Sequence, residues 1–389
     1  MRVVIFSETF LPAMDGIVRV MCLLLDHLHQ HGIETLVIAP QLGDEPVTEY
    51  NSSKVVTVAR PPIPWYPERR MTLPSPTVYR ALKEFQPDVA HFFHPVTIGL
   101  PGLLMVKQLG IPTLISFHLD FAQMATHFKY GFISLSFLKS GINLLTRFVF
   151  NSADYTLAPS RAMQCQMHKL GIQNVGLWKR GVDAERFHPR YRDAAMRQRL
   201  SDGHPDDIVL LYVGRLSQEK YLQDIRPVMD SMPNVRLALV GDGPYRQDLE
   251  RIFTGTNTVF TGYLRDEALS QAYASADIFV FPSSLETFGL VVVEAMAAGL
   301  PVVASRVGGI PDVLEEGATG YTFAIGDKDG LLDGLRRIVA NRETMQQMGR
   351  NARAFAETQT WGHMMDEVIV HYERIIHHKF YELSNSRTT

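Results

Sequence analysis

Short apolar runs and helical patterns alternate along the first half of the chain. The apolar run at residues 3–6 is followed by a polar loop, and then by an amphipathic pattern that predicts a helix from about residue 17 to residue 30. Alternating strands and helices are typical of βαβ units, in which the strands form a parallel sheet. The other strand-like runs of this half stand at residues 35–39, 55–58, 89–93, 113–117 and 154–160.

The same alternation resumes beyond a polar stretch at residues 190–207. Such a change of composition is typical of a domain boundary. We therefore predict an α/β protein with two doubly wound, Rossmann-like domains, the first over residues 1–190 and the second from residue 191 onward. The strand-like runs of the second domain stand at residues 208–213, 236–240, 259–260, 278–281 and 301–304.

The segment between the last two of these runs carries two acids. Glu286 follows the run at residues 278–281, and Glu294 lies about two turns further on, inside a helix rich in Leu, Val, Ala and Met. Because ligands of parallel sheets bind at the carboxyl ends of the strands, both carboxylates are expected to face one crevice and to accept hydrogen bonds from the diol of a sugar or ribose. The alternative interpretation is a helix-start acid and a solvated helix residue.

The start of this helix is also a predicted anion site. The amides of Phe288, Gly289 and Leu290 would form its first turn, where unsatisfied N–H groups and the helix dipole favour negative charge. The absence of a side chain at Gly289 lets a phosphate approach closely. We therefore expect a phosphate of the ligand to bind here.

Two further loops at strand ends carry candidate ligand contacts. Arg215 and Lys220 follow the run at residues 208–213, and two cations in one such loop suit a diphosphate. Solvation at the surface is the alternative. Gly241 follows the run at residues 236–240 in a glycine-rich turn, which would let the backbone approach a flat base, although the turn lacks the full dinucleotide fingerprint.

The first domain offers two candidates at equivalent positions. Gly16 stands where the first helix begins, at the place of a phosphate-approaching turn, with ordinary turn chemistry as the alternative. His118 ends the run at residues 113–117, so its side chain is expected to project into the crevice at the carboxyl edge of the sheet. A structural histidine with satisfied hydrogen bonds is the alternative at that position.

Length and composition fit a globular protein with more than one core. The chain has 389 residues, of which 46% are hydrophobic and 20% charged. Its two cysteines, Cys22 and Cys165, lie far apart without metal-ligand spacing, which indicates a reducing compartment. The first residues predict a buried strand and not a signal peptide, and no apolar run reaches the length of a membrane span. We therefore expect a cytoplasmic protein.

Charge is unevenly distributed between the halves. Residues 1–190 contain 18 Lys and Arg against 14 Asp and Glu, whereas the rest of the chain contains 20 against 27. Because the positive excess is small and not clustered, we expect an anionic membrane surface, and no nucleic acid, as a partner of the first half. The candidate lipid-facing surfaces are residues 61–70, which are aromatic and basic, and the apolar residues 128–150. A mobile loop and a buried core helix are the respective alternatives.

Several motifs of the second half resemble those of one large enzyme family. Taken in order, they are similar to the retaining GT-B glycosyltransferases that include sucrose synthases and bacterial mannosyltransferases. The resemblance implies two facing Rossmann-like domains and a final helix, at about residues 362–389, that crosses back onto the first domain. The motifs are Gly214-Arg215 with Lys220, Gly241-Asp-Gly-Pro244, Glu286-Thr-Phe-Gly289 with Glu294, and Gly308-Gly-Ile-Pro-Asp312.

The resemblance also implies how the two domains share the reaction. Residues 191–361 bind the nucleotide-sugar donor, and residues 1–190 together with the final helix bind the acceptor. Such enzymes keep the anomeric configuration of the sugar. The acceptor attacks on the face of the leaving group, and the departing phosphate takes its proton, so that no protein base is required.

Individual residues take their roles from the same resemblance. Arg215 and Lys220 hold the diphosphate, Glu286 contacts the hydroxyl groups of the donor sugar, and Glu294 contacts those of the ribose. His118 lies beside the sugar. The remaining donor oxygens meet Gly16 and the amides of Phe288, Gly289 and Leu290.

A narrower resemblance comes from the middle of the chain. Five segments are similar to those of sulfoquinovosyltransferases, which transfer sulfoquinovose from a uridine diphosphate donor to diacylglycerol: residues 61–70, 177–183, 187–192, 196–201 and 273–277. This resemblance implies UDP-sulfoquinovose as the donor, diacylglycerol as the acceptor and a peripheral association with membranes. Where the broader family has Asn-Gly-Val-Asp, this chain has Arg180 before Gly-Val-Asp. We hypothesise that Lys179 or Arg180 neutralises the sulfonate.

Metal-binding patterns are weak in this sequence. Asp327-Lys-Asp329 has the spacing of an Asp-x-Asp motif, but it opens a helix and predicts a helix cap. We therefore expect an enzyme that needs neither a metal ion nor a cofactor. Other functions stay open: a different lipid glycosyltransferase that uses UDP-glucose or GDP-mannose, a nucleotide-sugar epimerase, or a binding module without catalysis.

Overall fold

The chain folds into two compact units. The computed structural model describes all residues except 14–15, 43–44, 59–61, 64–65, 71–75, 94, 96–98, 119–134 and 387–389, and it describes no side chains within 62–63, 66–70, 135–139 and 380–386. The first unit comprises Met1–Lys179 and Met364–Thr389, and the second comprises Arg180–His363. The stretch 180–190 is therefore part of the second unit.

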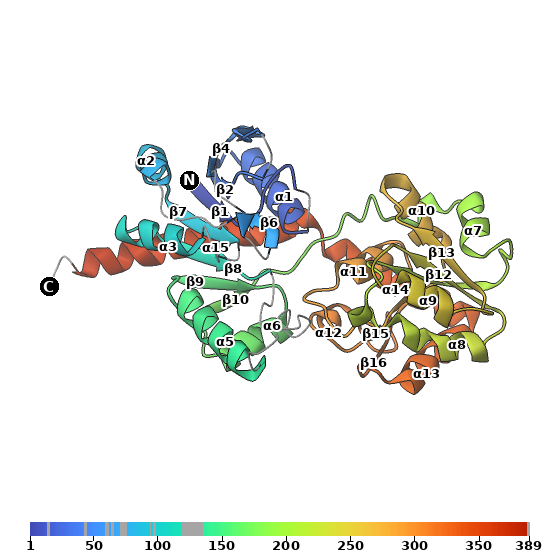
Figure 1. Cartoon of the computed structure of the whole chain (residues 1–389). Helices are drawn as coiled ribbons and strands as arrows, with labels where there is room; N and C mark the ends of the chain where they lie inside the picture. The colour runs from blue at the N-terminus through green and yellow to red at the C-terminus, as the bar shows by residue number, and fades with distance from the viewer. Residues whose placement is uncertain are drawn as a thin grey trace. The chain divides into compact units, whose positions relative to one another are not determined.

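An eight-stranded sheet forms the centre of the first unit, with the order β10-β9-β8-β7-β1-β2-β4-β3 (Figure 1). All its strand pairs are parallel except that of β3 with β4, as the alternation of strands and helices predicted. Its strands are β1 (Arg2–Ser7), β2 (Glu34–Pro40), β3 (Glu49–Tyr50), β4 (Ser53–Val58), β7 (Val89–Phe93), β8 (Thr113–Ser116), β9 (Tyr155–Ala158) and β10 (Val175–Leu177).

The central strands of this sheet are apolar on both faces because helices cover both sides. Val3, Val4 and Ile5 of β1 are completely buried, which explains a continuous apolar run in place of strict alternation. Phe6 stacks on Phe92 of the neighbouring strand with ring centroids 4.6 Å apart. The helices of this unit are α1 (Gly16–Gln30), α2 (Pro76–Phe85), α3 (Gly99–Gln108), α5 (Leu135–Asn151) and α6 (Arg161–Lys169).

The last helix, α15 (Trp361–Ser386), begins in the second unit and continues in the first, which confirms the predicted return. The indole of Trp178 donates to the carbonyl of Met364 over 3.1 Å, and Lys379 pairs with Asp154 at 3.2 Å. These contacts fasten the helix beside β9 and β10. Within the part of the chain that the structure describes, no helix is both long and apolar enough to cross a membrane.

A six-stranded parallel sheet forms the centre of the second unit, in the order β13-β12-β11-β14-β15-β16 (Figure 1). The strands are β11 (Ile208–Val213), β12 (Val235–Val240), β13 (Thr258–Gly262), β14 (Ile278–Phe281), β15 (Val302–Ser305) and β16 (Gly320–Phe323). The helices are α7 (Ala194–Leu200), α8 (Arg226–Ser231), α9 (Arg246–Ile252), α10 (Asp266–Ser275), α11 (Leu290–Ala297), α12 (Ile310–Val313), α13 (Lys328–Val339) and α14 (Arg342–Thr358).

The helix cap predicted for the Asp-Lys-Asp motif is confirmed. Asp327 is the N-cap of α13, and its carboxylate accepts a hydrogen bond from the amide of Gly330 over 2.9 Å. Of the two predicted lipid-facing surfaces, residues 61–70 contain only two short paired strands, β5 (Pro62–Ile63) and β6 (Tyr66–Arg70), among the described backbone. The other surface is described from residue 135 onward, and its residues 128–134 lie outside the described residues.

Candidate active site

The loop from β14 to α11 directs several of its backbone amides at one carboxylate oxygen. Three consecutive amides, those of Thr287, Phe288 and Gly289, lie 3.0, 3.4 and 3.2 Å from one oxygen of Glu286, to which they donate. Gly289 has a positive φ of 97° and is the N-cap of the helix, so the backbone turns sharply here. Two of the amides expected to meet donor oxygens, those of Phe288 and Gly289, therefore hold the carboxylate of Glu286 in the structure, together with the amide of Thr287.

Lys220 lies on the other side of the same carboxylate. Its ammonium is 3.9 Å from the second oxygen of Glu286 and donates to the carbonyl of Leu285 over 3.4 Å. It also lies over the ring of Phe281, 5.3 Å from the centroid. The side chains of Lys220 and Glu286 are each 19% exposed, so the pair is accessible but largely shielded from water.

Arg215 belongs to the same loop as Lys220, and its side chain is exposed. The hydroxyl of Tyr212 donates to the backbone carbonyl of Arg215 over 2.9 Å and so fixes this part of the loop. Burial raises the pKa of nearby Glu219, but the hydrogen bond from Ser217 and the charges of Lys220 and Arg215 outweigh it and leave that pKa lowered. Two cations thus act on one small region at the carboxyl end of β11.

The turn after β15 packs against the loop that contains Glu286. Gly308 has a φ of 52°, and a Cβ atom at this position would lie 1.7 Å from the carbonyl oxygen of Glu286. A Cβ at Gly309 would lie 2.8 Å from Phe288. The hydroxyl of Ser305 donates to the carbonyl of Ser283. The backbone of this turn therefore packs directly against the loop, which only glycine permits at position 308.

Glu294 is held by a residue to which sequence reasoning assigned no role. The hydroxyl of Tyr273 donates to one oxygen of Glu294 over 3.0 Å. Tyr273 is completely buried, and this burial raises its pKa well above the ordinary value. The phenol therefore stays protonated and orients the carboxylate. The residue pattern alone does not indicate this role for Tyr273, because a tyrosine in an α-helix is ordinarily interpreted as a residue of the hydrophobic core.

The turns after β11 and β12 pack backbone against backbone. Gly241 has a φ of 140°, and a Cβ there would lie 1.9 Å from the carbonyl oxygen of Gly214. The amide of Gly214 donates to Val240, and that of Gly241 donates to Gly262. Gly241 is thus needed for packing between strand ends, and its predicted contact with a base stays a prediction.

His118 and Gly16, two of the predicted site residues of the first unit, differ in burial and in their contacts. His118 follows β8 and is half-buried, and its Nε2 lies 2.7 Å from the hydroxyl of Ser116. The ring of Phe93 stacks on His118 with centroids 4.8 Å apart. Gly16 is the first residue of α1, is exposed, and has open space where a Cβ would lie.

The two predicted sulfonate contacts fall on either side of the unit boundary. Lys179 is half-buried, whereas Arg180 is only 6% exposed. Burial lowers the pKa of the Arg180 guanidinium to about 9. A cation at such a position gains much from an anionic ligand, because water screens its charge little.

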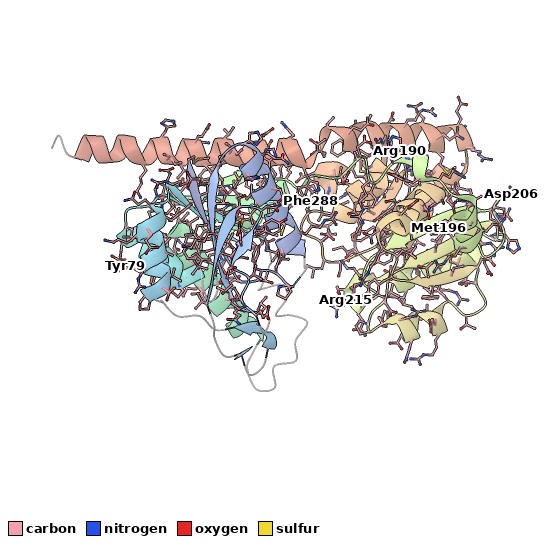
Figure 2. All side chains as sticks on the ribbon, turned by 90° about the horizontal axis from the view of Figure 1, so that it is seen from above. Tyr79, Arg190, Met196, Asp206, Arg215 and Phe288 are labelled. Carbon is pink, nitrogen blue, oxygen red and sulfur yellow. The ribbon has the colours of Figure 1, made fainter. Side chains whose placement is uncertain are left out.

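The structure thus assembles most of the predicted donor contacts on one edge of the second unit. Glu286 pairs with Lys220 and accepts from the amides of Phe288 and Gly289, and Arg215 belongs to the same loop as Lys220. Figure 2 labels Arg215 and Phe288 in this unit. Leu290 begins α11, and Glu294 follows within the same helix.

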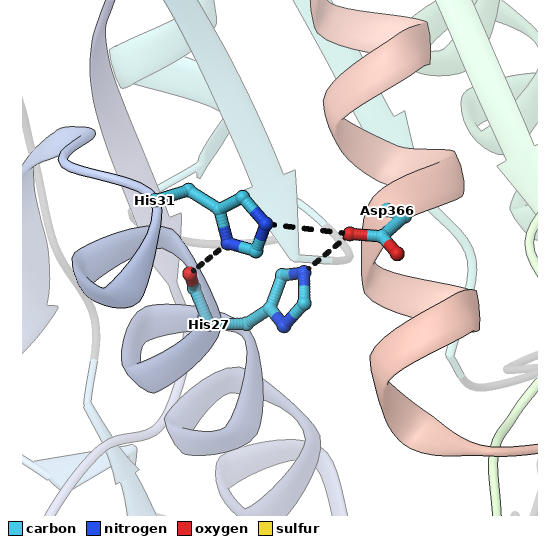
Figure 3. Close-up of side chains that lie close together, drawn as sticks. All are labelled: His27, His31 and Asp366. Carbon is cyan, nitrogen blue, oxygen red and sulfur yellow. Dashed lines mark hydrogen bonds and ion pairs between the residues drawn. The ribbon is translucent and has the colours of Figure 1, made fainter.

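One group of side chains in the described residues lies close enough to hold a metal ion. His27, in the last turn of α1, and His31, just after that helix, lie 2.7 and 3.7 Å from the same oxygen of Asp366 on α15 (Figure 3). All three belong to the first unit, and none is among the predicted site residues. In the structure the hydrogen bond between His27 and Asp366 links α1 to α15.

Comparisons with known proteins agree with the fold and the motifs. A family model described as glycosyl transferases group 1 matches residues 197–355, and one described as glycosyltransferase family 4 matches residues 14–186. Among solved structures, sucrose-phosphate synthase from Thermosynechococcus elongatus has a TM-score of 0.75 at 20% identity, covering 96% of this chain and 98% of that one. Anabaena HepE in complex with UDP has a TM-score of 0.76 at 19% identity, covering 96% and 100%.

Curated relatives share more of the sequence. Sulfoquinovosyl transferase SQD2 of Arabidopsis thaliana is 38% identical, over 86% of this chain and 66% of that protein. A GDP-mannose-dependent alpha-mannosyltransferase of Mycolicibacterium smegmatis is 35% identical over 97% of this chain and 98% of its own length. Alpha-monoglucosyldiacylglycerol synthase of Acholeplasma laidlawii is 26% identical over 90% and 92%. The chain therefore belongs to the group 1 glycosyltransferases with the GT-B fold.

Proposed function

We propose that this glycosyltransferase moves sulfoquinovose from UDP-sulfoquinovose to diacylglycerol, giving sulfoquinovosyldiacylglycerol. The observation that carries the proposal is the 38% identity to sulfoquinovosyl transferase SQD2 over 86% of the chain. A buried arginine at position 180, where the broader family has asparagine, supports an anionic sugar. The alternative is another membrane-lipid glycosyltransferase that uses UDP-glucose or GDP-mannose, which the names of the other relatives support.

The geometry of the second unit supports a separate role in donor binding for each of its polar site residues. Arg215 and Lys220 grip the diphosphate, and Glu294, oriented by Tyr273, accepts hydrogen bonds from the ribose. Glu286 binds hydroxyl groups of the sugar. Since its carboxylate now accepts from three amides, it must turn away from them when the donor arrives, which frees the amides for donor oxygens.

The proposed reaction retains the configuration at the anomeric carbon. The acceptor oxygen forms a bond to that carbon on the same face from which the bond to the diphosphate oxygen breaks, and the proton of the acceptor passes to that departing oxygen. The protein stabilises the negative charge that develops on the diphosphate through Arg215 and Lys220. Because these two cations can balance that negative charge without a metal ion, we expect the transfer rate to be unchanged by EDTA.

Arg180 is proposed to select the sulfonated sugar. In Arg180→Asn, we expect kcat/KM for UDP-sulfoquinovose to fall by about tenfold to a hundredfold, the value of a charge-assisted hydrogen bond, while UDP-glucose is used better. Release of UDP from a panel of donors measures both. The control is Arg190→Asn, since Arg190 is an exposed arginine of the same unit paired with Glu185. An unchanged donor preference in Arg180→Asn would remove this role.

The lowered pKa of Arg180 predicts that the donor preference depends on pH. Since burial lowers the pKa of Arg180 to about 9, the cation is present below pH 9 and is lost above it. The preference for the sulfonated donor over UDP-glucose, measured as a ratio of kcat/KM, should therefore be constant below pH 8 and decline as the pH rises through 9.

The acceptor is proposed to reach the enzyme from an anionic membrane surface, to which the cytoplasmic protein attaches peripherally. Leu144, Leu145 and Phe148 of α5 are 69, 56 and 63% exposed, and their spacing places them on one face. Arg147, also exposed, adjoins this face and can meet lipid headgroups. These residues belong to the second of the two surfaces expected from the sequence.

Removing this face should release the protein from membranes. In the double variant Leu144→Ser with Phe148→Ser, affinity for vesicles containing an anionic lipid should fall at least about tenfold, because two side chains lose their burial in lipid. Sedimentation with vesicles measures this. Leu104→Ser is the matched control, since Leu104 is 55% exposed but lies on α3. Equal vesicle binding by the double variant and the control would contradict the proposal.

A further inference from the structure

Four polar side chains form a continuous hydrogen-bonded chain within the first unit. The hydroxyl of Tyr372 on α15 lies 2.6 Å from Nδ1 of His91 on β7, and Nε2 of His91 lies 2.9 Å from the hydroxyl of Ser116 on β8. That hydroxyl lies 2.7 Å from Nε2 of His118. Tyr372, His91 and Ser116 are completely buried, and His118 at the end is half-buried.

Aromatic rings pack against both histidines of this chain. Phe93 stacks on His118 and also lies 4.6 Å from the ring of His91. Trp178 meets both imidazoles, at centroid distances of 5.8 Å for His91 and 6.0 Å for His118, and is itself fixed by its bond to α15. In such surroundings each hydrogen bond is strong and an unmet donor is costly, so the hydrogen atoms have little freedom.

The direction of the bonds follows from the buried phenol. Burial raises the pKa of Tyr372 well above its ordinary value, so the hydroxyl keeps its hydrogen. Within the described residues, the partner of that hydroxyl is Nδ1 of His91. Leaving a buried O–H without an acceptor would cost about 1–3 kcal/mol, so Tyr372 donates and Nδ1 accepts.

The remaining positions are then determined in turn. A neutral His91 that accepts at Nδ1 carries its hydrogen on Nε2 and donates it to Ser116. The hydroxyl of Ser116 has one hydrogen, which it donates to Nε2 of His118. His118 therefore carries its own hydrogen on Nδ1, at the other edge of the ring.

We propose that Tyr372, His91 and Ser116 are positioning residues that hold His118 as the neutral Nδ1–H tautomer, so that it donates a hydrogen bond to an oxygen of the donor sugar. The sugar contact rests on the proposed function. His118 thereby acts as a hydrogen-bond donor and not as a base, in keeping with a reaction in which the leaving phosphate takes the proton. The C-terminal helix supplies the group that sets this tautomer.

The tautomer can be read directly from the folded protein. Nitrogen-15 NMR of the histidine rings distinguishes a protonated Nδ1 from a protonated Nε2, and His118→Gln assigns the signal of His118 by its loss. We expect the wild type to show the Nδ1–H form, and Tyr372→Phe to show a mixture of both forms. Tyr155→Phe is the matched control, since Tyr155 also packs against α15, through His371, but lies outside the chain. It should match the wild type.

A wild-type signal of the Nε2–H form would overturn the proposal, as would a pure Nδ1–H signal in Tyr372→Phe. If Tyr372→Phe does not fold, Ser116→Ala, which removes the donor to His118, gives the same test. These outcomes hold whether or not any sugar is transferred, so they separate this proposal from the proposed function.

Turnover tests whether the tautomer matters for the reaction. We expect kcat of sugar transfer to fall about tenfold in both Tyr372→Phe and Ser116→Ala, the value of one hydrogen bond, and to stay within about twofold in Tyr155→Phe. An unchanged kcat in Tyr372→Phe, together with mixed tautomers, would show that the tautomer has no part in the reaction and would overturn the positioning role.

Discussion

Transfer by Lys220→Met is expected to be slower than that of the wild type by about a hundredfold in kcat, since removal of one preorganised charge from a transition state typically has this effect. Lys220 forms an ion pair of 3.9 Å with Glu286 and belongs to the loop after β11, where we propose that the diphosphate departs. Its charge is worth more in the transition state, when the diphosphate gains negative charge, than in the bound donor. The measurement is single-turnover transfer at saturating donor.

A second lysine of the same unit serves as the control for this variant. Lys328 lies at the start of α13 and forms an ion pair of 3.6 Å with Asp224. Lys328→Met removes the same charge from the unit and should leave kcat within about twofold of the wild type. A Lys220→Met enzyme as fast as Lys328→Met would contradict the assignment of leaving-group stabilisation to Lys220.

Gly308→Ala should lower the free energy of unfolding by roughly 3 kcal/mol. About 1 kcal/mol of this is the strain of a positive φ in alanine. The rest arises because the new Cβ would lie 1.7 Å from the carbonyl oxygen of Glu286, so the two loops must separate. This separation also displaces the amides of Phe288 and Gly289, where we expect a phosphate of the donor to bind, so affinity for UDP should fall with stability. Thermal unfolding and equilibrium binding of UDP measure the two effects.

The variant Gly317→Ala separates the effect of backbone strain at a positive φ from that of the steric clash. Gly317 also has a positive φ, of 74°, but a Cβ there would meet nothing within 4 Å. Its variant should lose only about 1 kcal/mol and keep its affinity for UDP. Equal losses of stability in the two variants would show that the packing of the turn against the Glu286 loop has no energetic weight.

Much of the fold could be predicted because parallel strands covered on both faces give continuous apolar runs. Such runs located β1, β2, β7, β11, β12, β14 and β15. The short edge strands β10 and β16 were not predicted. Their sequences, Val175-Gly-Leu and Gly320-Tyr-Thr-Phe, are too short and too mixed to form a run, and their conformation depends on pairing with β9 and β15.

The site shows the same division between local pattern and tertiary contact. Lys220 and Glu286 were both placed at strand ends, and the parallel order of β11 and β14 brings them together. That Glu286 accepts from its own following amides depends on the backbone angles of the loop, which no residue pattern reports. Likewise, the contact of His91 with Tyr372 joins residues 281 positions apart.

The measurement that tests the account most directly is the identity of the lipid product. Purified protein is mixed with diacylglycerol in anionic vesicles and with UDP-sulfoquinovose, UDP-glucose or GDP-mannose in separate reactions, and the lipid is analysed by mass and by the anomeric signal in proton NMR. We predict a sulfoquinovosyl lipid, formed only from UDP-sulfoquinovose and with the configuration of the donor retained. A glucosyl or mannosyl lipid in its place, or an inverted product, would contradict the proposed function.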